Sequence, residues 1–322
     1  MNEFIEVEAF IFGTKVYQKI CTDNFNKEQV HTIFNKANEI MLDFENRLSF
    51  YKNDSEIGKI NEKAGKSYVK VSEDTFEIIE KAKYYSEKTH GLFDITIAPL
   101  VKEWGINTYN PKIIQEDKVL EILKLVNYKD ILLKTETREV MLSKENQKID
   151  LGGIAKGYIA DKIIDFYKSK KVKSAIINIG GNIKVLGSKD NSEPWGVGIY
   201  KPQKHSQDII AKIKIQDESV VTSGDYERAF KYEGKLYHHI LNPLTGYPAN
   251  TDLKSITIVS KDSIKGDALA TPLFIMGKYK AYEFMKKYNI SGILVTNEDE
   301  IIISKDLISK FSLFENYKVL SF

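Results

Sequence analysis

The sequence DLGGIAKGYIAD (residues 150–161) places an acidic residue and two glycines directly before a helical pattern. We expect the helix to begin at or just after Gly153. Its apolar face would be formed by Ala155, Ile159, Ile163 and Phe166. Its polar face would be formed by Asp161, Asp165 and Lys168. Glycines at a helix N-terminus let a ligand approach the backbone, and the free N–H groups there favour an anion such as phosphate. A turn that needs only the backbone freedom of glycine is the alternative, and the position of Lys156 excludes a Walker A loop.

The regions around this stretch predict an α+β fold. Helical periodicity comes early, and strand-like segments are concentrated later, with the helical patterns at residues 27–50, 73–88 and 116–126 and the strands at 6–20, 130–141 and 174–200. Because helices and strands do not alternate regularly, a doubly wound parallel sheet is not expected. One compact domain over residues 1–322 is the simplest arrangement, although the length also allows a small insertion domain around residues 107–147.

Composition excludes several classes of protein. The 47 Lys and Arg residues nearly balance the 45 Asp and Glu residues, and no long block of one charge occurs, so a nucleic-acid partner is not expected. Cys21 is the sole cysteine, which excludes internal disulfides and thiolate metal clusters. No apolar run approaches the ~18 residues of a membrane span. Glutamates interrupt the apolar N-terminal stretch and no basic leader precedes it, so we expect no signal peptide and, as the sequence stands, a cytoplasmic protein.

The segment HHILNPLTGYPA, residues 238–249, offers candidates for a general base. Two prolines and a glycine impose turns on it, and a stiff loop of that kind would hold His238 or His239 in a fixed orientation. Because side chains alternate along a strand, one histidine should face inward and the other outward. A surface histidine beside a turn is the alternative.

The segment GDALATPLFIMG, residues 266–277, offers candidate metal ligands. Asp267 and Thr271 are four residues apart and would share one face of a continuous helix. With waters and a backbone carbonyl, a carboxylate and a hydroxyl suit Mg²⁺ better than a soft metal. The alternative is that Asp267 caps the helix and Thr271 is simply buried, and Pro272 predicts a break or kink at this point.

Three further segments have weaker signals. Gly180-Gly181, flanked by Asn178 and Asn182, is typical of a tight hairpin turn and could also contact a ligand. The segment TSGDYER, residues 222–228, is either a polar turn or part of a phosphate-binding and ribose-binding network. Aromatic residues near turns are either core residues or platforms for a planar ligand, and they include Tyr51, Phe93 and Trp104.

The order of these segments along the chain resembles the ApbE family, the FAD:protein FMN transferases. The resemblance covers nearly the whole chain, and its blocks are FGT (residues 12–14), RLSFYKNDSEIGKIN (47–61), GLFDITIAPLVKEWG (91–105), DLGGIAKGYIAD (150–161), INIGGNI (177–183), TSGDYER (222–228), HHILNPLTGYPA (238–249) and GDALATPLFIMG (266–277). Several blocks are weak alone, but the ordered set is specific.

This resemblance implies a fold and an activity. The fold would be a single α+β domain related to the T-fold. The enzyme would use Mg²⁺ to cut the pyrophosphate of FAD, release AMP and attach FMN through a phosphoester to a threonine or serine hydroxyl of an acceptor flavoprotein. By the same resemblance, the acceptor would be a redox-pump subunit or an FMN-binding domain.

The resemblance also implies roles for single residues. The Mg²⁺ ligands would be the main-chain carbonyl of Gly153 with the side chains of Asp267 and Thr271. His239 would take the proton from the acceptor hydroxyl and lie in the FAD site. The other residues at the FAD site would be Thr14, Tyr51, Trp104, Gly105, Asp150 and Lys156.

The chain departs from the family pattern in three respects. Asn242 stands where many relatives have Asp, which could change the orientation of the nearby histidine, and Pro272 follows the metal-binding threonine where a small residue is common. The missing leader implies either a cytoplasmic acceptor or, if a leader was removed, a membrane-anchored protein outside the cytoplasm.

Two alternatives to the transferase are an Mg²⁺-dependent FAD pyrophosphatase, which Tyr51 disfavours, and a non-catalytic flavin-binding protein, which would not need His239.

Overall fold

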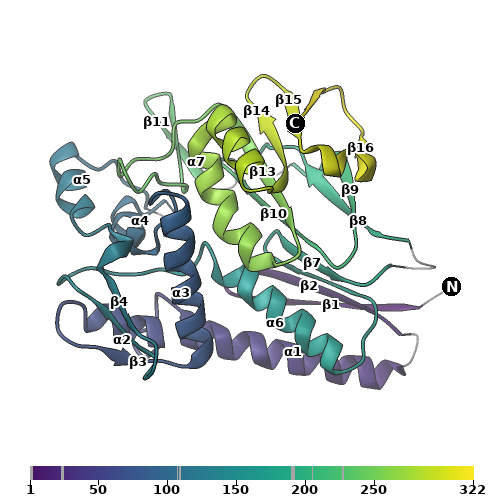
Figure 1. Cartoon of the computed structure of the whole chain (residues 1–322), viewed down its shortest axis with the longest axis horizontal. Helices are drawn as coiled ribbons and strands as arrows, with labels where there is room; N and C mark the ends of the chain where they lie inside the picture. The colour runs from purple at the N-terminus through teal and green to yellow at the C-terminus, as the bar shows by residue number, and fades with distance from the viewer. Residues whose placement is uncertain are drawn as a thin grey trace.

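A nine-stranded sheet occupies one half of the structure, on the right in Figure 1. The structure is a computed structural model that describes residues 3–22, 25–106, 108, 110–189, 193–204, 206–226 and 228–322. Across the sheet, the strands lie in the order β1 (Phe4–Ile11), β2 (Thr14–Cys21), β6 (Ala175–Ile179), β7 (Asn182–Leu186), β10 (Ser219–Gly224), β13 (Leu253–Ser260), β14 (Ser291–Thr296), β15 (Glu300–Ile303) and β17 (Lys318–Ser321). All neighbours are antiparallel except β15 and β17.

The two faces of this sheet bury different elements. Three helices cover one face, namely α1 (Lys27–Leu48), α6 (Ala155–Ser169) and α7 (Ser263–Lys287). A small three-stranded sheet covers part of the other face, with the strand order β16 (Phe311–Leu313), β9 (Ile209–Ile215) and β8 (Trp195–Tyr200). Strand alternation accounts for this arrangement, because Val16 and Ile20 of β2 face the helices, whereas Tyr17 and Lys19 point to the opposite face.

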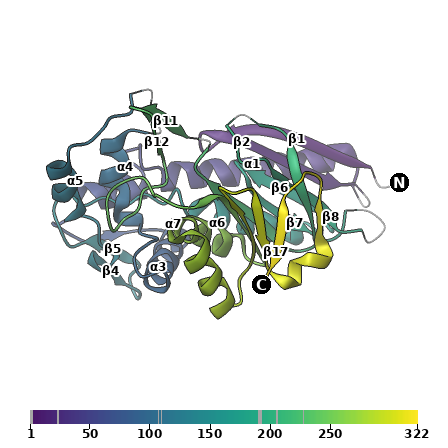
Figure 2. The same ribbon diagram turned by 90° about the horizontal axis from the view of Figure 1, so that it is seen from above.

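The remaining elements lie beyond one end of the large sheet (Figures 1 and 2). They are α2 (Glu56–Glu62), α3 (Glu73–Lys88), η1 (Ile95–Ile97), α4 (Ala98–Trp104), α5 (Glu116–Leu123), η2 (Tyr128–Asp130), a small sheet of β3 (Val69–Lys70), β5 (Glu139–Leu142) and β4 (Ile131–Lys134), and the hairpin of β11 (Ala229–Tyr232) and β12 (Lys235–His238). Ile131 and Val140 share one buried cluster with Ile159 of α6, which favours a single domain over a separate insertion. Within the described part of the chain, no helix has the length and apolarity to cross a membrane.

Most local predictions agree with these elements, but the prediction of a break at Pro272 is wrong. The helix that begins at Ala155 and the hairpin turn at Gly180-Gly181 are as expected. Helix α7 continues through Pro272, and its regular backbone is interrupted instead at Gly277, where φ is 76° and ψ is 171°. A side chain is strongly disfavoured at that φ, and the carboxylate of Asp252 accepts a hydrogen bond from the following N–H, that of Lys278, at 2.7 Å. The break therefore has a glycine and a cap of its own.

Helices α6 and α7 cross closely because each binds a carboxylate of the other. Oδ2 of Asp267 in α7 accepts the N–H of Gly157 at 2.8 Å, and Asp161 in α6 accepts the N–H groups of Ser263 and Ile264 at 2.9 and 3.0 Å. Neither helix has a side-chain hydrogen bond from its own N-cap residue. Asp161 therefore does not belong to a solvent-facing polar side of α6, as its spacing suggested, but caps the neighbouring helix.

Glycine at position 157 is required by this crossing. A Cβ atom there would lie 2.5 Å from the carbonyl oxygen of Ser263 and 2.7 Å from Cα of Ile264. Both atoms belong to the backbone, so the clash can be relieved only by moving one helix away from the other.

We predict that Gly157→Ala destabilises the protein. Alanine favours the helical state, yet the forced separation of α6 and α7 should lower the free energy of unfolding by about 1–3 kcal/mol. Urea unfolding followed by circular dichroism measures the change. Asp165→Ala, on the exposed side of α6, is the control and should unfold at the wild-type midpoint. Wild-type stability of Gly157→Ala would contradict the proposed contact.

Candidate functional site

Several of the predicted segments meet at one end of the nine-stranded sheet. Thr14 begins β2 beside the β6–β7 turn, since a Cβ atom on Gly180 would lie 2.6 Å from its Oγ1. Val221 of β10 pairs with Asn182, the first residue of β7, so residues 222–224 extend past β7 toward the same end. The FGT, INIGG and TSGD segments are therefore neighbours in space.

The glycine loop before α6 is anchored at this end of the sheet. The N–H of Asp150 donates to the carbonyl of Ile95 at 2.9 Å, and Oδ1 of Asp150 accepts the N–H of Gly152 at 2.9 Å. Burial raises the pKa of Asp150, whereas the Gly152 N–H and the charge of Lys156 lower it. Nζ of Lys156 donates to the Gly152 carbonyl at 2.7 Å and lies 3.7 Å from Oδ1 of Asp267. The lysine thus joins the loop to helix α7.

The two candidate side-chain metal ligands occupy consecutive turns of α7. Asp267 is 7% exposed and lies inside the helix, so it does not cap α7, as the alternative proposed. Oγ1 of Thr271 lies 3.4 Å from Oγ of Ser223 at the end of β10. Among the described residues, no group of three or more His, Cys, Asp and Glu side chains could hold a metal ion. A cation at this position would therefore depend on hydroxyl and carbonyl oxygens as well as the carboxylate.

The two adjacent histidines have different surroundings. His238 is 5% exposed and its Nε2 lies 2.8 Å from the carbonyl of Ala249, so its ring is held in the core. His239 is half-buried, and its Nδ1 has no hydrogen-bond partner among the described residues. Burial lowers the pKa of His239 to about 3, helped by the positive charges of Arg228 and Lys156. The positive charges of Arg228 and Lys156 therefore act on the His239 ring, and both disfavour its protonated form.

The loop after His239 is rigid, and Asn242 is part of the reason. Oδ1 of Asn242 accepts the N–H of Leu244 at 2.9 Å, and its backbone N–H donates to the carbonyl of Tyr247 at 2.8 Å. The side-chain oxygen of Asn242 stabilises the turn, a bond that an aspartate at this position could also accept.

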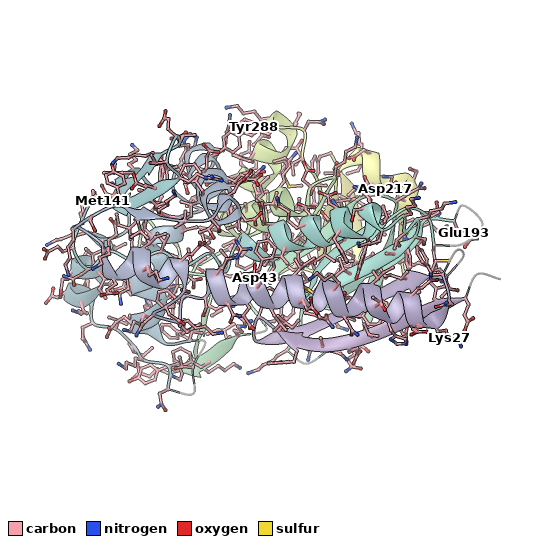
Figure 3. All side chains as sticks on the ribbon, turned by 90° about the horizontal axis from the view of Figure 1, so that it is seen from below. Lys27, Asp43, Met141, Glu193, Asp217 and Tyr288 are labelled. Carbon is pink, nitrogen blue, oxygen red and sulfur yellow. The ribbon has the colours of Figure 1, made fainter. Side chains whose placement is uncertain are left out.

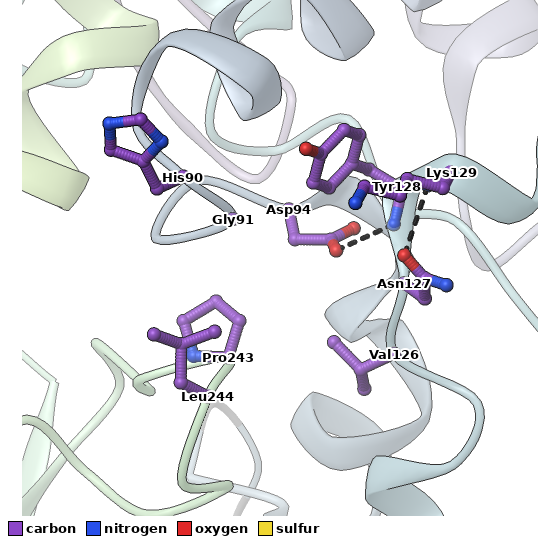
Figure 4. A pocket seen from close by; sticks show the side chains of 9 residues that line it. All are labelled: His90, Gly91, Asp94, Val126, Asn127, Tyr128, Lys129, Pro243 and Leu244. Atoms are coloured by element: carbon purple, nitrogen blue, oxygen red, sulfur yellow. Dashed lines mark hydrogen bonds between the residues drawn. The ribbon is translucent and has the colours of Figure 1, made fainter.

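A cavity of about 290 Å³ adjoins this loop on its outer side (Figure 4). Pro243 and Leu244 form one wall, and Asp94 lies on the other side. Both oxygens of Asp94 are occupied, because Oδ1 accepts from Thr96 and Oδ2 accepts the N–H of Tyr128 at 2.8 Å. The carboxylate therefore has a structural role in holding the turn at η2 against η1.

The candidate aromatic residues are not equivalent. Tyr51 is 77% exposed. Partial desolvation and the charge of Asp150 raise the pKa of Tyr51, and the charge of Arg228 lowers it. Trp104 is 1% exposed and donates its Nε1–H to the carbonyl of Gly246 at 2.8 Å. The Trp104 ring therefore supports the loop that follows His239. Gly105, with φ of 59°, ends α4 directly after Trp104.

Sequence reasoning missed two residues that organise the site. Gly157 and Asp161 fix the carboxylate of Asp267 and the angle of α7, yet neither has a local signal of function. The one available clue was a third glycine, Gly157, in the first turn of the helix, where glycine is costly unless a close contact requires it.

Comparison with known proteins identifies the family. The ApbE family model matches residues 12–294. An FAD:protein FMN transferase of Klebsiella pneumoniae (strain 342) is 33% identical over 99% of this chain and 98% of that protein, and one of Treponema pallidum (strain Nichols) is 30% identical over 91% and 84%. The crystal structure of the ApbE protein from Thermotoga maritima has a TM-score of 0.88 at 33% identity, covering 96% of this chain and 99% of that one. The flavin transferase ApbE from Vibrio cholerae shares the fold with a TM-score of 0.85 at 22% identity, over 96% and 100%. A family match over most of the sequence, relatives of this similarity and the common α+β fold show that the chain belongs to the ApbE family.

Proposed function

We propose that this protein transfers FMN from FAD to a threonine or serine hydroxyl of an acceptor flavoprotein, with Mg²⁺, and releases AMP. The observation that carries the proposal is the contact of Lys156 with both the Gly152 carbonyl and Asp267 at the glycine loop, in a chain whose relatives are named FAD:protein FMN transferases. The charge of Lys156 also acts on His239. These groups supply a base, a cation for phosphate and a carboxylate for a metal.

The oxygens at this position fit Mg²⁺. The carboxylate of Asp267, the hydroxyl of Thr271 and the carbonyl of Gly153 are hard donors of the kind this ion prefers. Oδ1 of Asp267 already faces a positive charge, that of Lys156, and Oδ2 is held by the N–H of Gly157. When bound, Mg²⁺ neutralises charge on phosphate oxygens and orients the group being transferred.

The surrounding residues would hold FAD. Lys156 and Arg228 supply positive charge for the pyrophosphate, and the N-terminus of α6 adds N–H groups beside them. The exposed ring of Tyr51 would cover a planar ring of the substrate, with Thr14 and Asp150 at the edges of the same site. Trp104 and Gly105 would act indirectly, because Trp104 binds the Gly246 carbonyl and so holds the loop that follows His239.

His239 would activate the acceptor. A bond forms between the acceptor oxygen and the phosphorus of the FMN half, the bond from that phosphorus to the oxygen of AMP breaks, and the hydroxyl proton passes to His239. Only a neutral imidazole can accept this proton, and the low pKa of His239 keeps the ring neutral at pH 7. The negative pyrophosphate would raise that pKa in the complex and so make the ring a stronger base.

Hydrolysis is the alternative to transfer, with water in place of the acceptor hydroxyl and the same proton transfer. The large exposed ring of Tyr51 favours transfer, because an aromatic side chain over the substrate limits the access of water. Flavin binding without chemistry is less well supported, since it would not need a histidine held at the phosphate-binding side of the loop.

The protonation of His239 can be tested directly. Its pKa of about 3 in the folded protein lies below the value of about 6.5 in an unfolded chain. Between these values only the unfolded chain binds the proton, so this residue makes the fold less stable as the pH falls through that window. In NMR titrations of the free protein, with His239→Asn used for assignment, we expect no inflection of the His239 ring signal above about pH 5. An inflection near the unfolded value would contradict the burial of the ring.

Loss of the base should abolish transfer and spare binding. We expect His239→Asn to slow flavinylation of an acceptor domain at least about 100-fold, while the affinity for FAD stays close to that of the wild type. Intact-mass spectrometry measures the gain of one FMN, and AMP is quantified in parallel. His31→Asn, on the exposed side of α1, is the matched control. Undiminished transfer by His239→Asn would exclude it as the base, whereas AMP release without labelling by the wild type would indicate hydrolysis.

Loss of the carboxylate should appear in the metal titration. For Asp267→Ala we expect the Mg²⁺ concentration that gives half-maximal AMP release to rise at least about tenfold, since loss of a group that merely supports a ligand already costs that much. Asp165→Ala removes an exposed carboxylate from the same region and should leave the titration unchanged. An unaltered curve for Asp267→Ala would remove this residue from the metal site.

A further inference from the structure

A second cavity, of about 330 Å³, lies along β8, the edge strand of the small sheet, beside the large sheet and away from the glycine loop. Glu193, one of its lining residues, is labelled in Figure 3 near the N-terminal end of the molecule, opposite Met141 of β5. Tyr17, Lys19 and Ile176 form its floor on the large sheet. The other wall comes from β8, β9 and the residues before β8.

Gly196 of β8 leaves room for a lysine side chain at this cavity. Gly196 pairs with Lys214 of β9, and its missing side chain leaves room for Lys212, which lies across it. A Cβ atom on Gly196 would lie 2.0 Å from Cε of Lys212. Two lysine side chains can therefore lie over the same part of the strand, an arrangement that a larger residue would prevent.

The charge of the cavity is strongly positive. Four lysines line it, at positions 19, 189, 212 and 214, against one carboxylate, that of Glu193. Lys19 is paired with Glu6 at 3.0 Å, but the other three lysines form no ion pair with any residue that the structure describes. Like charges held together without counterions are unfavourable, and a bound anion would relieve their repulsion.

Trp195, in the wall of the same cavity, has a polar atom without a partner among the described residues. Its side chain is 4% exposed and lines the cavity, and its Nε1–H is buried without an acceptor among the described residues. An indole nitrogen can only donate a hydrogen bond, and a buried donor without a partner carries a free-energy cost. The ring of Phe4 packs edge-on against this indole. Nζ of Lys19 lies 5.4 Å from the centre of the Phe4 ring.

We propose that this cavity binds a phosphate-type anion, separately from the flavin site. Lysine ammonium groups bind phosphate as point charges, and the indole of Trp195 lies in the wall beside them. The apolar surfaces of Ile176, Pro194 and Trp195 would contact the organic part of a phosphorylated ligand.

The two tryptophans of this chain permit a direct test with inorganic pyrophosphate. In ¹⁵N NMR spectra each gives one indole N–H signal, which Trp195→Phe assigns, or Trp104→Phe if the first variant does not fold. In metal-free buffer with EDTA, we expect pyrophosphate to shift the Trp195 signal in a saturable manner and to leave the Trp104 signal in place. No shift, or a shift of the Trp104 signal alone, would overturn the proposal.

Substitution of the unpaired lysines completes the test. Lys212→Ala/Lys214→Ala should weaken pyrophosphate binding at least about tenfold. Lys63→Ala/Lys280→Ala removes the same charge from exposed positions elsewhere and should bind as the wild type does. Equal affinity in the two double variants would overturn the assignment. Cosedimentation with phosphatidylglycerol vesicles that depends on Lys212 and Lys214 would assign the phosphate to a lipid headgroup, and a response to pyrophosphate alone would assign it to a soluble ligand.

Discussion

The exchange of carboxylates between α6 and α7 is the interaction on which the site depends. The N-terminus of each helix has free N–H groups and a partial positive charge, and each receives a carboxylate from the other helix. Lys184, 2.9 Å from Asp161, compensates the second carboxylate further. This exchange fixes the buried carboxylate of Asp267 beside the glycine loop, with Oδ2 bound to the N–H of Gly157 and Oδ1 3.7 Å from Nζ of Lys156.

The rest of the site follows from that crossing and from the end of the sheet. The glycine loop leads directly into α6, Thr271 follows Asp267 by one turn of α7, and the strands deliver Thr14 and Ser223 to the same end. His239 is placed by a different device, a short hairpin followed by a rigid loop that packs on Trp104. Rigid elements therefore hold the groups that need fixed geometry, and the exposed ring of Tyr51 is left to a turn.

Local patterns predicted much of the fold but not the contacts between distant segments. Periodicity predicted the start of α6 within two residues, the α3 helix and the Gly180-Gly181 turn, because these depend on neighbouring residues. The break at Gly277 and the capping role of Asp161 depend on partners far along the chain, Asp252 and Ser263, and spacing alone contains no information about them. The difference between His238 and His239 was expected from alternation, but the identity of the inward ring needed the packing against Ala249.

The two outer strands of the large sheet, β1 and β17, decide whether it can pair with another molecule. A long open sheet has two outer strands whose free N–H and C=O groups can pair with another molecule. Here one outer strand, β17, has only four residues and carries Lys318, which is bound to Glu300 at 2.9 Å, and the other, β1, alternates apolar residues with glutamates. Short length and charge at these borders disfavour strand exchange between copies, so a sheet of nine strands can persist without recruiting a tenth from a neighbour.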